Sequence, residues 1–376
     1  MPVRVLHYVG KMNRGGMETF IMNLYRKIDR EKIQFDFAVH GNIAGDFAEE
    51  IESFGGKFYY FPQMRQNPME YRKAWRNFWK ENSKNYIVFH MHTNSLANII
   101  ALEEATRVNV PIRIVHSHSS MANKGRLQRL NDFLHKRNLR RLEHLATNLF
   151  SCSDKAAQWL FGGNEVGNLQ VQQIKNGVDT ESFKFDLVKR NRIREELNIE
   201  KNKVIGHIGA FLPVKNHKFL LEIIEQAYRK DNSIRCILIG DGELRSEMES
   251  IVSDKKLEDV ILFLGKCDNV NEMLSAMDVF LMPSLYEGLP VCLVEVQTNG
   301  LPALVSDSIT KDVELKDNLC YYDLSKGAEL WANQLLEILS NEKRDDNIDN
   351  IIRSGFDIKE TVCLYEKIIM KGGNMR

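Results

Sequence analysis

Short apolar runs alternate along the whole chain with longer stretches whose apolar residues recur at helical spacing. Such runs, rich in Val, Ile, Phe and Tyr, predict buried strands. In the first half they are VRVLHYV (3–9), FDFAVH (35–40), KFYYF (57–61), YIVFHMH (86–92), IRIVHSH (112–118) and NLFSCS (148–153). In the second half they are KVIGHIGAF (203–211), IRCILIG (234–240), VILFLG (260–265), VFLMPS (279–284) and PALVS (302–306).

Helical patterns lie between these runs, for example at residues 18–28, 217–230 and 243–256. Strands that alternate with helices predict parallel sheets built from βαβ units. Because the alternation occurs in both halves, we expect an α/β fold with two doubly wound, Rossmann-like domains. The predicted domains are 1–175 and 176–355, followed by a C-terminal helix within 356–376 that we expect to pack back on the first domain.

Length and composition agree with this division. A chain of 376 residues is too long for one ordinary core, and its 43% hydrophobic and 27% charged residues are typical of globular proteins. The net charge of zero hides an asymmetry, since residues 1–175 carry 25 basic and 16 acidic side chains and the remainder carries 26 and 35. We predict neither a membrane-spanning helix nor a signal peptide, and the six cysteines lack metal-binding spacing, so a cytoplasmic location is expected.

Several predicted strands end in residues that suggest chemistry. GKMNRGGMETF follows the first strand, and Gly15 and Gly16 would let a ligand approach the backbone at a helix N-terminus, which favours anions. The sequences HMH and HSH place His90, His92, His116 and His118 at the ends of two strands. A metal site, a histidine that contacts substrate and purely structural histidines are all conceivable. No neighbouring acidic or cysteine cluster completes a coordination shell, so we predict no metal.

Residues 124–145 have the pattern of a basic amphipathic helix. Its positive side chains are Lys124, Arg126, Arg129, Lys136, Arg137, Arg140 and Arg141, and leucines form its apolar stripe. This composition suits an anionic membrane surface or a phosphorylated acceptor, although a solvated helix face has the same pattern. No nucleic-acid-binding motif accompanies it, and we expect no nucleic-acid partner.

The second half places a lysine and two glutamates near strand ends. Lys215 lies between a strand and a helix, where an ammonium group can reach phosphate oxygens. The stretch SLYEGLPVCLVEV carries Glu287 and Glu295, separated by seven residues, in an apolar context. A carboxylate is costly to bury unless a charge or a hydrogen-bond donor meets it. The sequence therefore raises the question of what these two carboxylates bind.

The combination of motifs resembles the retaining glycosyltransferases of the GT-B fold, family 4. The motifs are GGMETF, HSHSS, IKNGVDTESF, GHIGAFLPVKNH, GDGELR and FLGKCDNVNEMLSAMDVFLMPSLYEGLPVCLVEVQTNGLP, and they span about residues 1–310 in family order. The most similar group acts in exopolysaccharide and capsule assembly. The resemblance implies two domains that face a cleft, with the acceptor bound by the first and the nucleotide sugar by the second.

The resemblance also implies a role for each site residue. Glu287, with the backbone amides of Gly288 and Leu289, would contact the donor sugar, and Glu295 the ribose hydroxyls. The diphosphate would meet Lys215 and the Gly15–Gly16 turn, while Lys266 and Cys267 would frame the base through their backbone. His118 matches the family's cleft histidine, and His116 is the alternative because the HSH doubling makes the alignment ambiguous.

One position departs from the family pattern. The family usually has an arginine directly after the glycine of the GHIG strand, and this chain has Ala210. The resemblance thus implies that one cation that would stabilise the departing diphosphate is missing, with Arg14 and Arg245 as candidate substitutes.

We therefore expect a metal-independent, retaining glycosyltransferase without a cofactor. It would transfer a hexose from a nucleoside diphosphate sugar, UDP-linked, to a saccharide or lipid-linked saccharide at the inner face of the membrane. The alternatives are another GT-B enzyme, such as a sugar-nucleotide epimerase or a phosphorylase, and a weakened sugar-nucleotide-binding scaffold subunit of a polysaccharide complex.

Overall fold

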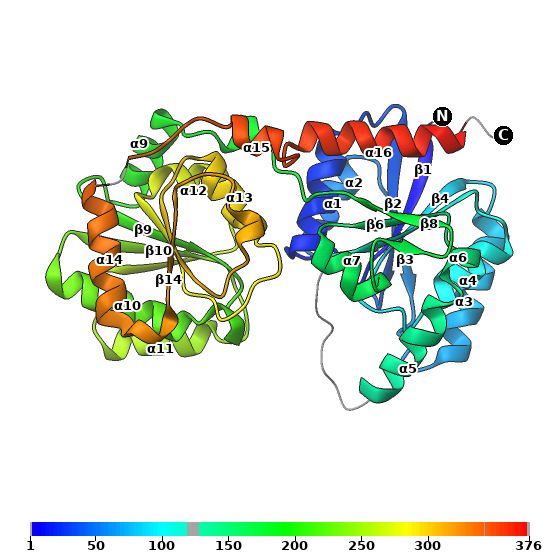
Figure 1. Ribbon diagram of the computed structural model, residues 1–376, viewed down its shortest axis with the longest axis horizontal. Helices are drawn as coiled ribbons and strands as arrows, with labels where there is room; N and C mark the ends of the chain where they lie inside the picture. Colours follow the sequence, from blue (N-terminus) through cyan, green and yellow to red (C-terminus); the bar gives the residue numbers. More distant parts are fainter. Residues whose placement is uncertain (1, 119–127, 342, 374–376) are drawn as a thin grey trace. The chain divides into compact units, whose positions relative to one another are not determined.

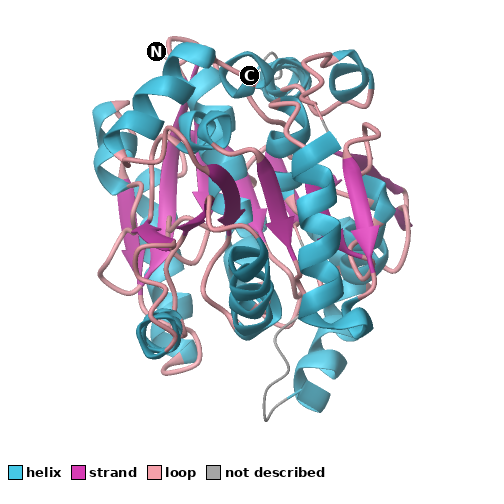
Figure 2. Cartoon of the chain, turned by 90° about the vertical axis from the view of Figure 1, so that its left-hand side faces the viewer, coloured by secondary structure: helices cyan, strands magenta, loops and turns pink. Residues whose placement is uncertain are grey.

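The computed structural model describes residues 2–118, 128–341 and 343–373, and these form two compact units. Unit 1 comprises the chain up to Gly177 together with the segment from Ile358 onward, and unit 2 comprises Val178–Asp357. The boundary lies two residues beyond the one expected from the sequence. Both units are α/β, with two doubly wound parallel sheets as expected (Figures 1 and 2).

Unit 1 contains an eight-stranded sheet with the order β3-β2-β1-β4-β5-β6-β8-β7. All neighbours are parallel except β7 and β8, a short antiparallel hairpin that the sequence pattern did not predict. Its strands are β1 (Val3–Tyr8), β2 (Ile33–His40), β3 (Phe58–Phe61), β4 (Tyr86–His92), β5 (Ile112–Ser117), β6 (Asn148–Ser151), β7 (Glu165–Val166) and β8 (Leu169–Gln173). Its helices are α1 (Gly16–Lys27), α2 (Ala48–Ser53), α3 (Pro68–Asn82), α4 (Ile100–Arg107), α5 (Gln128–Leu139), α6 (Leu142–Leu145), α7 (Asp154–Phe161) and α16 (Ile358–Gly373).

Unit 2 contains a six-stranded, all-parallel sheet with the order β11-β10-β9-β12-β13-β14. Its strands are β9 (Lys203–Ile208), β10 (Ile234–Ile239), β11 (Ile261–Gly265), β12 (Val279–Met282), β13 (Ala303–Ser306) and β14 (Leu319–Tyr322). Its α-helices are α8 (Thr180–Phe183), α9 (Leu187–Glu196), α10 (His217–Lys230), α11 (Arg245–Asp254), α12 (Val270–Ala276), α13 (Val291–Thr298), α14 (Gly327–Asn341) and α15 (Asp349–Arg353). Three 3₁₀ turns complete it: η1 (Pro213–Lys215), η2 (Lys311–Val313) and η3 (Leu324–Lys326).

Each sheet is buried on both faces, because helices cover both sides of the strands (Figure 2). Adjacent strand residues therefore enter different cores: Val5 packs in one core of unit 1 and Leu6 in the other, and Val204 and Ile205 divide in the same way in unit 2. Burial on both faces explains why the strands are continuous apolar runs rather than alternating ones.

Several helices begin at local capping signals. Asn67 accepts a hydrogen bond from the backbone N–H of Glu70 ahead of α3, which has Pro68 in its first turn. Ser153 caps α7 in the same way through Ala156 N–H. Such side chains satisfy backbone donors that the first helical turn leaves without partners.

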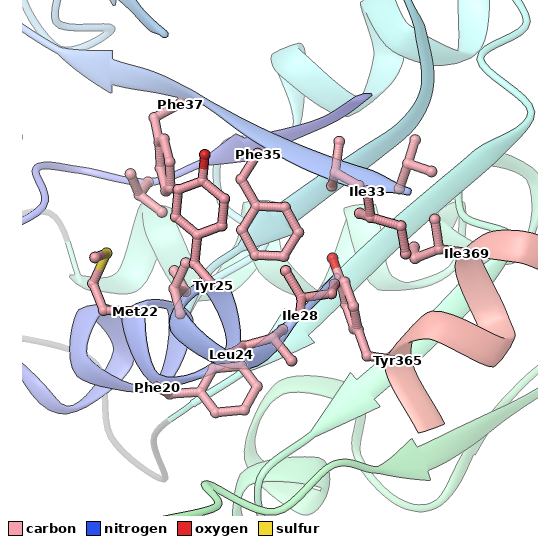
Figure 3. Close-up of a cluster of buried hydrophobic side chains, with 14 of the residues drawn as sticks. Phe20, Met22, Leu24, Tyr25, Ile28, Ile33, Phe35, Phe37, Tyr365 and Ile369 are labelled. Atoms are coloured by element: carbon pink, nitrogen blue, oxygen red, sulfur yellow. The ribbon is translucent and has the colours of Figure 1, made fainter. Parts of the chain in front are cut away.

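The C-terminal helix α16 returns to unit 1, where it lies beside α1 (Figure 1). Tyr365 and Ile369 of α16 are fully buried among Ile28, Ile33 and Phe35 (Figure 3). The chain therefore closes the core of its first unit with its last helix.

The basic segment 124–145 is not one helix. Residues 124–127, with Lys124 and Arg126, lie outside the described residues, and 128–145 form α5 and α6 with a turn at Arg140 and Arg141. Tertiary contacts favour this break: buried Asn138 donates to the Leu96 carbonyl at 2.7 Å, and Arg141 pairs with Glu103 at 2.8 Å. No helix in the described part of the chain is both long and apolar enough to span a bilayer.

Candidate functional site

Lys215 and Glu287 meet at the carboxyl ends of two neighbouring strands of unit 2, β9 and β12. Lys215 Nζ lies 2.7 Å from Glu287 Oε1, and the two side chains are 17% and 12% exposed. The loops that carry them are joined by a backbone hydrogen bond from Leu285 N–H to the Val214 carbonyl, 2.8 Å long. In parallel sheets this edge is where ligands bind.

Glu295 lies within α13 and is only 8% exposed. Within residues 2–118, 128–341 and 343–373, its carboxylate has no hydrogen-bond or ion-pair partner, and burial raises its pKa to about 7. The charges of Lys215, Glu287 and Glu295 all act on the thiol of Cys292, so the three groups lie in the neighbourhood of this thiol. Glu295 is thus a buried carboxylate that has no hydrogen-bond donor among the described residues.

Gly288 and Leu289 form the approach to α13. Neither residue donates a backbone hydrogen bond to any group in the described part of the chain, and α13 has no acidic residue in its first turn. Backbone N–H groups of this kind favour an anionic or oxygen-rich ligand.

Lys266 and Cys267 follow β11, which is separated from β9 by β10. Gly265 precedes them with φ +68°, a left-handed conformation that glycine adopts without strain. A Cβ at Gly265 would lie 3.1 Å from Arg245 Nη1, so the Arg245 guanidinium extends beside this loop while its Nε donates to Glu249 at 2.7 Å. Arg245 is therefore close to the strand end expected to frame the base.

Ala210, the position that departs from the family pattern, is exposed. A Cβ at its neighbour Gly209 would lie 3.5 Å from Lys215 Cε, so the residue before Ala210 borders the lysine. Because the Ala210 side chain is exposed, a longer side chain can extend into solvent there.

The glycine turn of unit 1 lies against the carboxyl of Glu18, a residue that the sequence analysis did not single out. Gly15 caps α1, which begins at Gly16, and a Cβ at Gly15 would clash with Glu18 Oε2. Burial raises the pKa of the Glu18 carboxyl. A phosphate at this helix N-terminus would meet Glu18, so the turn is less suited to anions than the two glycines alone indicated.

Five histidines gather at the carboxyl ends of adjacent strands in unit 1. The sequence motifs contain four of them, and β1 contributes His7, which is paired in register with His90. His116 is fully buried, whereas His118, one residue beyond β5, is partly exposed. Desolvation lowers the pKa of all five, to about 3 for His7 and His118, so the rings are neutral.

The ring nitrogens form two hydrogen-bonded rows. In one row His7 Nδ1 lies 2.9 Å from His92 Nε2, and His92 Nδ1 lies 2.7 Å from His118 Nε2. In the other, the Tyr365 hydroxyl lies 2.9 Å from His90 Nδ1, and His90 Nε2 lies 3.3 Å from His116 Nδ1. This pairing could not be predicted from the sequence, because the strands that contribute the rings are far apart in the chain.

Two triads of these rings have nitrogens within 4.8 Å of one another: His7, His90 and His92, and His92, His116 and His118. Spacing alone would allow a metal ion. However, His90 and His92 stack with centroids 4.0 Å apart and an interplanar angle of 28°. Imidazoles bind metals in the ring plane, and stacked rings do not direct their lone pairs to one point. The hydrogen-bonded rows fit this geometry better.

Comparison with known proteins gives the family. Residues 189–354 match the model of glycosyl transferases group 1, and residues 14–182 match that of Glycosyltransferase Family 4. The Bacillus subtilis protein EpsF, named as a glycosyltransferase, is 38% identical over 96% of this chain and 94% of its own length. The chain belongs to the group 1 glycosyltransferases, with a family 4 N-terminal domain. Lys215, Glu287 and Glu295 of this glycosyltransferase lie in the group 1 match.

Further relatives agree with this assignment. The Staphylococcus aureus capsular polysaccharide biosynthesis glycosyltransferase CapH is 25% identical to this glycosyltransferase over 95% of this chain and 98% of CapH. The solved structure of Anabaena HepE in complex with UDP-glucose has the same fold, with a TM-score of 0.75 over 98% of this chain and 99% of HepE at 16% identity. These matches do not favour the epimerase or the scaffold subunit as alternatives.

Proposed function

We propose that this glycosyltransferase transfers a hexose from a UDP-linked donor to a saccharide or lipid-linked saccharide acceptor in surface polysaccharide synthesis. The observation that carries the proposal is the grouping of Lys215, Glu287 and the unpartnered Glu295 at one sheet edge of unit 2. This arrangement offers one cation for a diphosphate and two carboxylates for hydroxyl groups, which is what a nucleotide sugar requires.

On the donor side, Glu295 accepts hydrogen bonds from the two ribose hydroxyls, which would satisfy a carboxylate that the described residues leave without a donor. Lys215 binds the diphosphate, and Glu287 contacts the sugar together with the N–H groups of Gly288 and Leu289. The backbone of Lys266 and Cys267 frames the base. Preorganised donors of this kind stabilise negative charge as it develops on a leaving group.

In the N-terminal unit, His118 contacts the reacting sugar. It is preferred to His116 because His116 is fully buried, whereas His118 is partly exposed. The Gly15–Gly16 turn contributes backbone N–H groups near the donor phosphates, although a phosphate close to this turn would also meet the Glu18 carboxyl. The rest of this unit binds the acceptor.

The names of similar proteins support the choice of donor and acceptor. An Escherichia coli protein that is 28% identical over 52% of this chain and 53% of its own length has a name specifying transfer of galactose from UDP-Gal to a diphosphoundecaprenol-linked sugar. HepE has been crystallised with UDP-glucose, and EpsF and CapH are named as glycosyltransferases, CapH for capsular polysaccharide. We extend these properties to this chain, together with retention of anomeric configuration and independence of metal ions and cofactors.

We place the enzyme in the cytoplasm, on the inner face of the membrane. Lys136, Arg137 and Arg140 are exposed on or next to α5, where Leu130 and Phe133 are 50% and 64% exposed. Basic and apolar side chains together suit an anionic lipid surface.

The test is a panel of nucleotide sugars examined by thermal stabilisation and by hydrolysis without acceptor. A donor at 100 times its dissociation constant stabilises a protein by about 2.7 kcal/mol, which is readily measured. UDP-hexoses are expected to stabilise and to be hydrolysed slowly, with no requirement for divalent ions. If no nucleotide sugar stabilises the protein, the proposal is wrong.

A further inference from the structure

Trp159 of α7 is exposed in a way that the other tryptophans are not. All four tryptophans of the chain lie within the described residues, and of these Trp159 alone is exposed, at 42%, whereas Trp75, Trp79 and Trp331 are completely buried. Tryptophan is highly buried on average, so this exposure needs an explanation. The indole nitrogen is the only polar atom of the side chain and is already hydrogen-bonded, so the side chain offers carbon to solvent.

The indole is held in one orientation. Trp159 Nε1 donates to the carbonyl of Asn94 at 3.0 Å, and the next residue of the helix, Leu160, is fully buried in the core. The loop that carries Asn94 is itself fixed, because Asn138 of α5 donates to the Leu96 carbonyl at 2.7 Å. A surface that is ordered before a ligand arrives binds it with a smaller loss of entropy.

The loop that the indole contacts follows the sheet edge at which the proposed function places the reacting sugar. His92, the last residue of β4, pairs in register with His116 of β5. The ladder continues to Thr93, whose N–H donates to the His116 carbonyl at 3.0 Å. Asn94 and His118 each lie two residues beyond this register pair, so they follow the carboxyl ends of neighbouring strands at the same level. Ligands of parallel sheets bind at this edge.

Three consecutive polar residues, Thr93, Asn94 and Ser95, surround in sequence the carbonyl that the indole binds. The Thr93 hydroxyl donates to the Ser95 carbonyl at 2.8 Å, and the Ser95 hydroxyl accepts from the Ala97 N–H at 3.2 Å, so each hydroxyl keeps hydrogen-bonding capacity. Asn94 is exposed, and its side-chain amide makes no hydrogen bond within residues 2–118, 128–341 and 343–373. The loop thus combines a flat carbon surface with polar groups that can still bind a ligand.

A pyranose ring has the complementary chemistry. One of its faces presents polarised C–H bonds, and its hydroxyl groups project around the rim. The π face of an aromatic ring carries partial negative charge and attracts positively polarised groups, and tryptophan does so most strongly. We propose that Trp159 is the stacking surface of a subsite that binds one pyranose ring of the saccharide acceptor, whose hydroxyls bond to the 93–95 loop. The inference rests on the proposed function in that unit 1 binds a saccharide acceptor.

A lipid surface is the competing occupant, because tryptophan is also common at membrane interfaces. Acyl chains would desolvate the polar side chains of the 93–95 loop without offering them hydrogen bonds, which is costly. The hydroxyls of a sugar would instead provide partners for these groups. The position of the loop beside the carboxyl end of β5, where His118 lies, also favours a saccharide.

The first measurement is acrylamide quenching of tryptophan fluorescence in the parent protein, which requires no variant and no donor. Because the other three tryptophans are completely buried, the readily quenched component reports on Trp159. The probes are the methyl α- and β-pyranosides of glucose, galactose and N-acetylglucosamine. We expect at least one of them to remove this component in a saturable way. If none does, or if phosphatidylglycerol vesicles protect the indole and the pyranosides do not, the proposal is overturned.

Two substitutions separate stacking from support of the loop. Trp159→Phe keeps an aromatic face but loses the bond to Asn94, whereas Trp159→Ala loses both. Tyr60→Ala is the matched control, since Tyr60 is an aromatic residue of β3 that is 51% exposed. By saturation-transfer NMR with the protecting pyranoside, Trp159→Phe and Tyr60→Ala should retain binding, and Trp159→Ala should lose affinity by about tenfold or more. Equal losses in the two Trp159 variants would show that this residue only supports the loop.

Failure of this inference and failure of the proposed function give different results. Donor binding is measured by the thermal stabilisation that nucleotide sugars produce, and pyranoside binding by the fluorescence of Trp159 without donor. If nucleotide sugars stabilise the protein while no pyranoside protects Trp159, the subsite is wrong and the donor site stands. If no nucleotide sugar stabilises it, the proposed function is wrong, while protection of Trp159 still decides whether this loop binds a saccharide.

Discussion

Lys215 and Glu287 form an ion pair with Nζ and Oε1 2.7 Å apart, at the ends of neighbouring strands β9 and β12. In the proposed function a diphosphate and the sugar that it carries bind at this pair. The lysine would then divide its three N–H donors between the Glu287 carboxylate and the phosphate oxygens. This sharing would hold the carboxylate and the diphosphate in fixed positions relative to the bound sugar.

Removing this cation should nearly abolish turnover. We expect Lys215→Ala to lower kcat by about 10²–10³-fold, because a charge-assisted contact to the leaving group is lost. Lys218→Ala, an exposed lysine on α10, is the control and should retain kcat. A change of less than about threefold for Lys215→Ala in a donor-turnover assay would show that this corner does not limit the reaction.

Restoring the arginine of the family pattern should increase turnover. Ala210 is exposed beside Gly209, so an arginine side chain has room there, and its planar fork suits a diphosphate better than a point charge. The measurement is kcat of Ala210→Arg with one donor. If Arg245 already fills this role from its position beside Gly265, Ala210→Arg should lower kcat, and Arg245→Ala should be as damaging as Lys215→Ala.

Nucleotide binding should depend on pH through Glu295. The pKa of this carboxyl is raised from 4.5 to about 7 by burial, so the empty site is largely protonated at pH 6. A ribose that donates two hydrogen bonds requires the ionised form. UDP binding at pH 6 should therefore release a proton, and affinity should rise as pH increases toward 7. Calorimetry in two buffers with different ionisation enthalpies measures this release.

The same group should influence stability. Between about pH 4.5 and 7 the folded state binds more protons at Glu295 than the unfolded state does, so its contribution to stability falls as pH rises. Glu295→Gln should remove this dependence and stabilise the ligand-free protein at pH 8. Glu295→Ala should weaken UDP binding by about 1–3 kcal/mol. Unchanged affinity for UDP would exclude the ribose assignment.

The exposed cations around α5 should bind anionic vesicles. Arg137→Glu combined with Arg140→Glu is expected to release the protein, because each basic side chain near such a surface contributes about 1 kcal/mol. The effect should diminish at high salt, since these side chains are exposed. Vesicle co-sedimentation is the measurement, with Lys201→Glu and Lys218→Glu in unit 2 as the matched pair. Equal binding by the two double variants would contradict a specific membrane surface.

The last helix should be essential to the stability of unit 1. Tyr365 is fully buried between α16 and the core and bonds to His90. Tyr365→Ala should reduce the free energy of unfolding by about 3–5 kcal/mol, as for other large aromatic truncations. Met370→Ala on the same helix, where Met370 is 38% exposed, should have little effect. Urea denaturation of the two variants tests the difference.

The pattern of strands and helices and the presence of two units could be predicted from the sequence because each depends on local order. Strands that are buried on both faces need continuous apolar runs, and helices need caps and a periodic apolar stripe. Glu287 and Glu295 are conspicuous because carboxylates are unusual in such apolar surroundings. A window of a few residues contains all of this information.

Contacts between distant residues required the tertiary structure. Strand register brings His7 next to His92, 85 positions away, and α16 carries Tyr365 to His90 across 275 positions. The break between α5 and α6 arises in the same way, from the contact of Asn138 with Leu96, 42 positions away. Periodicity determines which face of an element is buried. What that face meets depends on where the sheet places it. The sheet places His118 Nε2 within hydrogen-bonding distance of His92 Nδ1, and the fold leaves Glu295 buried without a hydrogen-bond or ion-pair partner among the described residues.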